Sequence, residues 1–262
     1  MRYFRLYRVF VLQYLKTLMQ SKLDFFVGLI AFFFTQLAGI VFMYLIFEHI
    51  PNLNGWSFDQ ILFIYGFAQL PRGIDHLFTD YLWILAMRLV VRGEFDRYLL
   101  RPLNPLFQVV AERFQLDALG EILVGLILVV TASTRMGIKI GLFNSIVFFV
   151  SIIAGAIIYT SIKLFFASIA FWTKDSIGLL QLVYESSDFA KYPISIYDKR
   201  IRFLLSYVFP FAFVAFFPAS YFLGEAKLLT TVGIEVLISV IAFKIAYATF
   251  NKGLTVYESA GN

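Results

Sequence analysis

Ionisable side chains stand at helical spacing inside one long apolar segment of the chain. Arg72 and Asp75 are three residues apart, and His76 and Asp80 are four apart, so each pair can form an ion pair along one face of a helix. Charged groups at membrane depth are costly and often mark ion pathways or proton relays. These four residues, with Glu235 in a later apolar segment, are candidates for a polar path through the protein. The alternative is that the pairs only neutralise one another or lie at the membrane interface.

The densest charge cluster in the chain runs from Arg92 to Pro105. Gly93 permits a sharp turn, while Pro102 and Pro105 prevent the preceding helix from continuing. About two turns of amphipathic helix fit between them, and its candidate partner-contacting residues are Glu94, Phe95, Asp96, Arg97, Tyr98, Leu99 and Arg101. A short charged helix between two membrane spans is suited to pressing against a soluble partner.

The apolar residues of this short helix share one side. Phe95 and Leu99 are four residues apart, and Tyr98 borders them. We expect Phe95 and Leu99 to anchor an interface with the charged residues around them, because a few buried anchors carry most of the energy of a small interface. The alternative is that this loop only connects two spans and that its charges only set the membrane topology.

Residues suited to catalysis are scarce. The chain has no cysteine and two histidines, which argues against thiolate or histidine-rich metal sites. No nucleophile and base stand at a suggestive spacing, and no G-x-x-x-x-G-K-[ST] phosphate loop occurs. We therefore assign no catalytic residue, metal or cofactor to this chain, and any ATP-driven work would need an ATPase on another chain. The net charge of +5 reflects membrane topology and is not a sign of nucleic-acid binding.

Composition places the chain in a membrane. Of its 262 residues, 60% are hydrophobic, 15% are charged and 32 are phenylalanine. Long uncharged runs of this kind indicate membrane helices, so we predict one all-α polytopic membrane domain. Its six membrane segments are predicted at residues 25–47, 58–91, 106–134, 142–172, 177–192 and 228–250.

Basic residues orient these segments. An amphipathic interfacial helix is predicted over residues 1–22, and its arginines and lysines precede the first span, whereas the loop 48–57 has neither. By the positive-inside rule, both termini and residues 92–105 are cytoplasmic, with 48–57 and 135–141 outside. Lys163 stands toward the inner end of the fourth span, where we expect it to snorkel to the interface.

Two stretches leave alternatives open. Residues 58–91 would make a helix of about 50 Å, which either tilts into the cytoplasm or kinks at Pro71 and Gly73. For residues 177–225, one layout has 177–192 crossing outward and 203–223 dipping into the outer leaflet. The other lays 177–200 on the cytoplasmic surface and makes 203–223 a span, which the positive-inside rule favours because four basic residues stay inside.

Several motifs resemble those of a known family. The chain resembles the small-permease branch of the ABC type-2 permease family, in which a charged run follows the second span. The resemblance covers essentially the whole chain, and its most specific part is the run Arg-Gly-Glu-Phe-Asp-Arg-Tyr-Leu-Leu-Arg-Pro-Leu-Asn-Pro. Weaker features that also fit are Gly55-Trp56-Ser57, Tyr192-Pro193, Tyr207-Val208-Phe209-Pro210 and Tyr221.

The resemblance carries further implications. It implies that residues 1–22 are an elbow helix, that 94–101 are a coupling helix, and that 193–225 are an extracellular re-entrant element before the last span. It also implies a bacterial exporter in the cytoplasmic membrane, in which a separate ATPase subunit binds ATP and Mg. A second permease, related or identical, would complete the complex.

Two other function classes are weighed on the residues alone. A secondary, proton-coupled transporter would use the intramembrane acids Asp75, Asp117, Glu121 and Glu235 as carriers, although no internal repeat is visible. A membrane-embedded enzyme has the least support. The substrate is not indicated, because the many aromatic residues suit an amphipathic cargo and ordinary lipid-facing helices equally well.

Overall fold

The computed structural model describes residues 2–18, 22–138 and 141–259. Within these ranges the regular secondary structure is helical, and the β-pairing is confined to one isolated bridge between Leu53 and Trp56. Residues 1 and 19–21 of the predicted interfacial helix and Lys139 of the predicted outer turn lie outside the described residues. The prediction of an all-α protein is confirmed.

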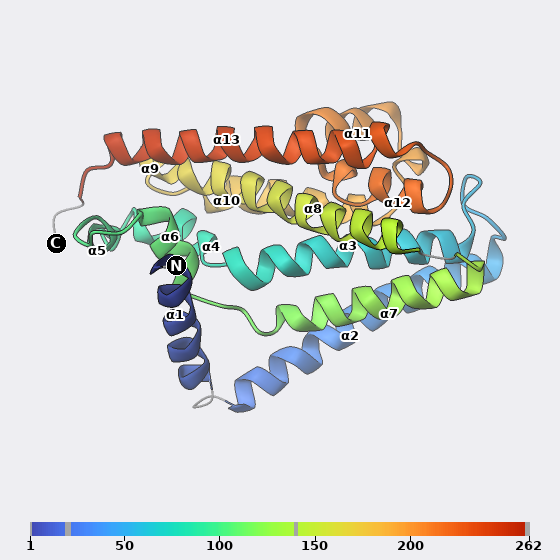
Figure 1. Ribbon diagram of the computed structural model, residues 1–262, viewed down its shortest axis with the longest axis horizontal. Coiled ribbons are helices and arrows are strands. Elements are labelled where there is room, and N and C mark those ends of the chain that lie inside the picture. Colours follow the sequence, from blue (N-terminus) through green and yellow to red (C-terminus); the bar gives the residue numbers. More distant parts are fainter. Residues whose placement is uncertain (1, 19–21, 139–140, 260–262) are drawn as a thin grey trace.

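Four long helices run along the long axis of the molecule (Figure 1). They are α3 (Phe58–Thr79), α7 (Ala118–Met136), α8 (Leu142–Ser168) and α13 (Val232–Val256). The most extensive packing joins α3 to α7 and α13 to α8, and α8 also lies against α3. Helix α8 therefore occupies the middle of the bundle, between α3 and α13.

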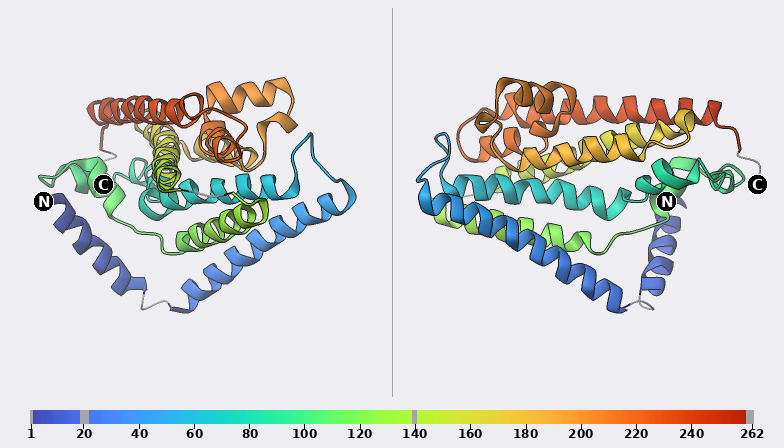
Figure 2. Two further views of the ribbon diagram at one scale, coloured as in Figure 1. Left: turned by 45° about the vertical axis from the view of Figure 1, so that its right-hand side comes forward. Right: turned by 180° about the vertical axis from the view of Figure 1, so that it is seen from behind.

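Two further helices form an open V at the N-terminal side of the bundle (Figure 2). Helix α2 (Lys22–His49) crosses the face of α7, and α1 (Arg2–Leu18) leads back toward α6 (Pro105–Ala111). The ring of Tyr3 packs edge-on against Phe107, with 4.8 Å between centroids. On α1, Arg5, Arg8, Gln13 and Lys16 are exposed, while Tyr7, Phe10 and Val11 are half-buried. Helix α1 is thus amphipathic, as a helix on a membrane surface needs to be.

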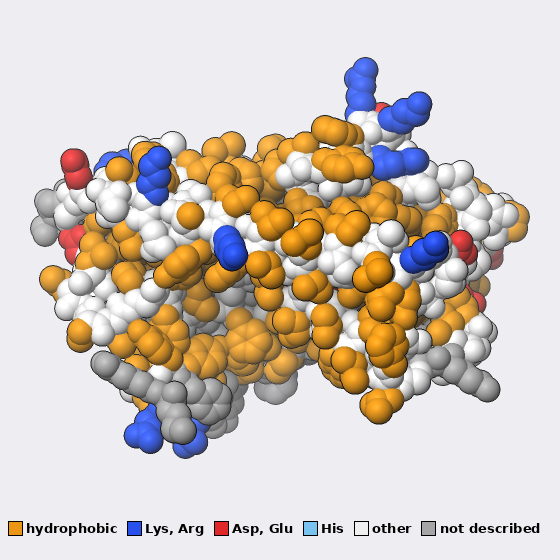
Figure 3. Space-filling model, turned by 45° about the horizontal axis from the view of Figure 1, so that its top comes forward, with side chains coloured by type: hydrophobic (Ala, Val, Ile, Leu, Met, Phe, Trp, Pro, Cys, Tyr) orange, Lys and Arg blue, Asp and Glu red, His pale blue; other side chains and the backbone are white. Residues whose placement is uncertain are grey.

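Three helical stretches among the described residues are long and apolar enough to cross a membrane. They are Ala118–Met136, Leu142–Thr173 (α8 with the short α9, Ala170–Thr173) and Leu228–Val256 (the 3-10 turn η6, Leu228–Thr230, with α13). A bent pair of shorter helices, 199–208 and 211–222, makes a fourth if it is a single span. Large apolar side chains cover much of the face shown in Figure 3. The chain is therefore a helical membrane protein, and the count of six spans stays a prediction.

The predicted segment 58–91 is not one helix. Helix α3 continues unbroken through Pro71 and ends at Thr79, after which come the single turn α4 (Leu82–Ile84) and the π-helical turn η1 (Leu85–Leu89). One continuous helix over 58–91 is therefore ruled out, because the chain breaks after Thr79, and Asp75 faces the protein interior, as the kinked alternative predicted. At Pro71 the two helices α3 and α8 approach closely, because a Cβ added at Gly155 of α8 would lie 2.9 Å from the proline ring.

Residues 177–225 run from one end of the bundle to the other. They form α10 (Ile177–Glu185), the 3-10 turns η2 (Ser186–Lys191) and η3 (Ile194–Ile196), α11 (Lys199–Phe203), the π-helical turn η4 (Leu204–Val208), η5 (Phe211–Phe213) and α12 (Phe216–Phe222). A bend of 75° separates 199–208 from 211–222, and both parts lie at the same end of the molecule (Figure 1). The segment 199–222 thus turns back on itself within one end of the bundle and does not run its full length.

The loop before α3 holds this element in place. The Nδ2 atom of Asn54 donates to the carbonyl oxygen of Ser195 (2.7 Å), and Nε1 of Trp56 donates to its hydroxyl (2.8 Å). Ser195 therefore lies at the same end as loop 50–57, opposite the charged run 92–105 (Figure 1). This geometry supports the layout in which 177–192 crosses the bundle, and it does not fit the one that lays 177–200 along the opposite, charged end.

Candidate functional site

The centre of the bundle holds an ion pair that is closed to solvent. The Lys163 ammonium on α8 lies 2.7 Å from Oδ2 of Asp75 on α3, and both side chains have an exposed fraction of 0%. Three hydroxyls also donate to the Asp75 carboxylate: Thr79 at 2.6 Å, Thr160 at 2.9 Å and Tyr184 at 3.2 Å. Every lone-pair direction of this carboxylate is therefore used inside the protein.

Helix geometry explains how these groups meet. Asp75 and Thr79 are one turn apart on α3, and Thr160 and Lys163 are nearly one turn apart on α8. The close approach of the two helices at Pro71 and Gly155 leaves the next turn of each facing the other. Tyr184 reaches in from α10, so the network joins three helices.

A second ion pair joins α3 to the segment after α10. The guanidinium of Arg72 lies 2.5 Å from Oδ1 of Asp188 in η2, and Lys191 reaches the same oxygen at 2.8 Å. The Arg72 guanidinium carbon also lies 5.4 Å from the centroid of the Tyr184 ring, within range of a cation–π contact. Arg72 thus pairs across the bundle, not along its own helix.

His76 stands between two carboxylates. Its Nε2 lies 3.2 Å from Asp80 on the same helix, and its Nδ1 lies 3.2 Å from Glu121 on α7. Gln115 donates to the other oxygen of Asp80 at 3.1 Å. This cluster ties α3 to α7 and to the loop that precedes α7.

Glu235 is separate from these groups. It lies in the first turn of α13 and is fully buried, and Ser151 of α8 donates to it at 2.5 Å. Among the described residues, the predicted polar path is therefore a row of separate pairings along α3, made by Arg72, by Asp75 and by His76 with Asp80, and a lone carboxyl group between α8 and α13.

The pairings confirm one expectation and correct two. His76 and Asp80 interact as predicted. Arg72 and Asp75 do not pair, because they face different neighbours, Asp188 and Lys163 respectively. The prediction that Lys163 snorkels to the interface is wrong, since its ammonium is completely buried against Asp75. The partners Lys163, Thr160, Tyr184 and Asp188 were not recognised in the sequence, although a lone lysine inside an apolar span is itself a signal of a buried partner.

The charged run 92–105 forms a compact knob at the other end of the bundle. Its helix is shorter than predicted, a single turn at α5 (Asp96–Leu99), followed by α6. The Arg97 guanidinium donates to the carboxylate of Glu112, the residue just after α6 (2.8 Å), and to the Tyr98 hydroxyl (2.7 Å). The Tyr98 hydroxyl in turn donates to the other oxygen of Glu112 (2.7 Å). Burial, then the neighbouring Glu112, raises the pKa of Tyr98 above its ordinary value, so this hydroxyl stays a neutral donor.

The expectation that Phe95 is a docking anchor is corrected by its burial. Phe95 has an exposed fraction of 0%, and its ring packs edge-on against Phe171 of α9 (5.1 Å between centroids) and against Tyr257 beyond α13 (5.3 Å). Tyr98 is equally buried, whereas Leu99 is 45% exposed and Leu100 is 85% exposed. The apolar face of the short helix is therefore used inside the chain, because α9 and the end of α13 lie beneath it.

The exposed part of this knob has a definite chemical character. Leu99 and Leu100 project from it, and the side chains of Arg92, Arg97 and Arg101 are exposed around them. Glu94 is held by Arg88 at 3.1 Å, and Asp96 accepts from the Tyr257 hydroxyl at 2.9 Å. Glu94, Asp96 and Arg97 thus bond within the chain, and the exposed side chains of the knob include the two leucines and the three arginines.

Comparison with known protein families assigns this chain to one of them. A family model described as "ABC-2 family transporter protein" matches residues 32–261. The chain belongs to the ABC-2 transporter family. No curated protein and no solved structure matches it significantly.

Membership gives this ABC-2 protein a role in transport. The family supplies membrane components of ABC transporters, which work with an ABC-type ATPase subunit, so the chain is an ABC-2 permease located in the cell membrane. The match includes both the Asp75–Lys163 network and the basic knob. The family resemblance inferred from the charged run and the aromatic–proline motifs is thereby confirmed.

Proposed function

We propose that the chain is the membrane-spanning permease subunit of an ABC exporter in the bacterial cytoplasmic membrane. A separate ATPase subunit would bind ATP and Mg and hydrolyse the nucleotide. The observation that carries the proposal is the basic and apolar knob formed by residues 92–105, within a chain that belongs to the ABC-2 family. A phosphate-binding loop is missing from the full sequence, which is consistent with an ATPase on another chain.

The exposed knob is the proposed docking surface for the ATPase. Leu100, at 85% exposure, is the most exposed large apolar residue of the knob, and Leu99 lies beside it. Exposed leucines ringed by arginines suit a partner pocket with an apolar floor and an acidic rim. Leu99 and Leu100 take over the anchoring role that the spacing alone assigned to Phe95 and Leu99, with Arg97 and Arg101 at the rim.

Phe95 has a different proposed role, in transmitting movement. Its ring lies between Phe171 of α9 and Phe250 of α13, at 5.1 Å and 6.4 Å. A push on the knob would therefore be applied directly to the ends of α8–α9 and α13, two helices that pack extensively on each other. Close-packed interiors transmit strain in this way, because they resist compression.

The positive-inside rule orients the permease. We place the knob and both termini in the cytoplasm, with loop 48–57 and the re-entrant element 193–225 outside. A second permease, related or identical, would flank a common path, and switching of packed helices between two arrangements would give alternating access. The three links from Arg72, Asp75 and His76 to neighbouring helices would hold one arrangement together.

The pairing of Asp75 and Glu121 favours this proposal over proton-coupled secondary transport through those two acids. A carrier carboxylate has to exchange protons with water, but Asp75 is sealed from solvent by one ammonium and three hydroxyls. The Glu121 carboxylate lies 3.2 Å from Nδ1 of His76. A structural network of this kind is better suited to holding helices than to loading protons.

The docking surface can be tested by shortening its two leucines. An affinity-tagged chain is purified from native membranes in mild detergent, and the preparation is assayed for ATP hydrolysis and for a chain that cross-links to azido-ATP. We expect Leu99→Ala with Leu100→Ala to lower both signals roughly tenfold, since removal of two interface anchors costs more than about 1.4 kcal/mol. Leu229→Ala, at a site 79% exposed at the opposite end of the bundle, is the matched control.

Two outcomes decide between docking and a mere connection. If the wild-type preparation contains no ATP-binding chain, or if the double variant retains the wild-type signals, the knob is only a connection between helices. A variant that loses the ATPase while keeping the wild-type melting temperature supports docking.

A further inference from the structure

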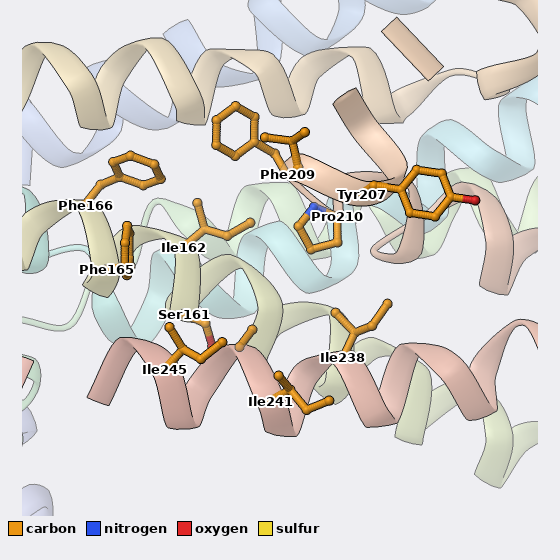
Figure 4. Close-up of a pocket in the computed structure, with 12 residues that line it drawn as sticks. Ser161, Ile162, Phe165, Phe166, Tyr207, Phe209, Pro210, Ile238, Ile241 and Ile245 are labelled. Atoms are coloured by element: carbon orange, nitrogen blue, oxygen red, sulfur yellow. The ribbon is translucent and has the colours of Figure 1, made fainter. Parts of the chain in front are cut away.

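An apolar groove opens on the side of the bundle between α8, α13 and the bend of the re-entrant element. Its volume is about 370 Å³. Figure 4 shows Ile238, Ile241 and Ile245 of α13 facing Ile162 and Phe165 of α8, with Pro210 across the space from α13. Ser161 also lines the groove, but its hydroxyl donates to the Ile157 carbonyl of its own helix. The groove therefore offers hydrocarbon surface along its length.

A second cavity lies next to the groove, on the other side of Tyr207. Its volume is about 480 Å³, and Tyr207 lines both spaces. Its lining includes the exposed cations Lys199 and Arg202, together with Ser195 and Ser206, and it includes no carboxylate. The nearest acid along the chain, Asp198, accepts a hydrogen bond from the backbone N–H of Ile201 as the cap of α11.

The arginine at this mouth is held in position. Its Nη2 donates to the carbonyl oxygens of Ser195 (3.1 Å) and Tyr197 (3.3 Å), which leaves the other N–H groups of the guanidinium available. Arg202 and Lys199 come from the same turn of α11, so both charges face one space. Basic side chains stand out from the apolar surface where α11 lies (Figure 3).

We propose that these two adjacent spaces together bind one anionic phospholipid. One acyl chain lies in the groove, and the phosphate lies between Lys199 and Arg202. Ile238 to Ile245 span about 10 Å of helix axis, which suits a length of acyl chain and not a polar ligand. The cations lie at the end of the bundle that carries loop 50–57, where lipid headgroups would be (Figure 1).

The cations determine which lipid is preferred. Any acyl chain fits an apolar groove, so the tail does not discriminate between lipids. Each lysine or arginine near an anionic headgroup contributes a modest attraction, and this site has one of each. The site therefore prefers phosphatidylglycerol to zwitterionic phosphatidylcholine with the same chains, by roughly tenfold. This inference concerns the opposite end of the molecule from the knob and does not depend on ATP coupling.

Native mass spectrometry of the full chain in detergent tests the site. The protein is titrated with dioleoyl phosphatidylglycerol and, separately, with dioleoyl phosphatidylcholine. We expect the roughly tenfold preference in the wild type and its loss in Lys199→Gln with Arg202→Gln. Arg200→Gln with Lys227→Gln removes two exposed cations that do not line the mouth, and it should keep the preference.

A second variant tests the groove itself. Ala242→Phe fills the space from α13 and should weaken binding of both lipids, with an unchanged melting temperature showing that the bundle is intact. Equal binding of the two lipids by the wild type overturns the proposal, as does equal loss in the two charge variants. A dimer that forms without lipid and dissociates in Ala242→Phe also overturns it, because a second copy would then be the occupant.

Discussion

The buried Asp75–Lys163 pair allows a sharp quantitative prediction. Lys163→Met keeps most of the side-chain volume but leaves the Asp75 carboxylate buried without its cation. Removing one partner of a buried ion pair costs about 3–5 kcal/mol. For a chain of this size, each kcal/mol lowers the melting temperature by about 2–4 °C. The expected loss is therefore roughly 6–20 °C, measured as the unfolding midpoint of the purified permease in detergent.

A double variant separates charge from packing. Adding Asp75→Asn removes the carboxylate charge, yet the new side chain can still accept from Thr79 and Thr160 and can donate to the Tyr184 hydroxyl. Replacing both members of a buried pair is often neutral, so the double variant should return to within about 4 °C of wild type. If it melts as low as Lys163→Met alone, the loss arises from packing of the lysine stem and the ion pair is not the cause.

An exposed pair provides the control for this experiment. Arg135 and Asp59 lie 3.4 Å apart with exposed fractions of 56% and 32%. An ion pair in contact with solvent contributes about 0–1 kcal/mol, so Arg135→Met should lower the midpoint by less than about 4 °C. The reasoning is refuted if Lys163→Met behaves like Arg135→Met, because the buried pair would then contribute no more than the exposed one.

Two further predictions concern topology and packing. Cysteines introduced at Asn52 and Ser195 should both react with a membrane-impermeant thiol reagent in intact cells, and one at Arg97 should react only after permeabilisation; the opposite pattern means that the orientation is inverted. Gly125→Leu should destabilise the permease by about 1–3 kcal/mol, because an added Cβ at Gly125 already lies 2.8 Å from Leu70 and 2.9 Å from the Gly66 carbonyl oxygen. A wild-type melting temperature in this variant would show that α3 and α7 are not in close contact.

Local pattern was enough to predict the helical class and several elements. The apolar runs correspond to α7, α8 and α13, and the spacing of His76 and Asp80 predicted their contact, because these features depend on residues close in sequence. The partner of Asp75 could not be found in this way. Lys163 is 88 residues away, and only the packing of α3 on α8 brings the two together.

The error at Phe95 has a related cause. Amphipathic spacing shows that Phe95 and Leu99 lie on one side of a short helix, but it does not show what covers that side. In the structure the Phe95 ring is covered by Phe171 and Phe250, which are distant in sequence. The most exposed leucine, Leu100, follows the short helix, so helical periodicity could not identify it. For residues 177–225, the positive-inside rule favoured a layout that puts Ser195 at the same end of the bundle as the charged run 92–105. The rule counts charges only and does not account for loop 50–57, whose side chains hold Ser195 at the opposite end.

The composition of the Phe95 pocket has a consequence for biogenesis. The ring contacts Phe171 and Tyr257, and the neighbouring Asp96 accepts from the Tyr257 hydroxyl, so the pocket is built from parts of the chain about 160 residues apart. During synthesis, the knob therefore cannot reach its final form until the ribosome has added residue 257 and α13 has entered the bilayer. An ATPase that recognises the finished knob would bind completed permeases and pass over nascent or truncated ones. Assembly of the transporter would then follow synthesis, with the order of events enforced by the packing of one phenylalanine.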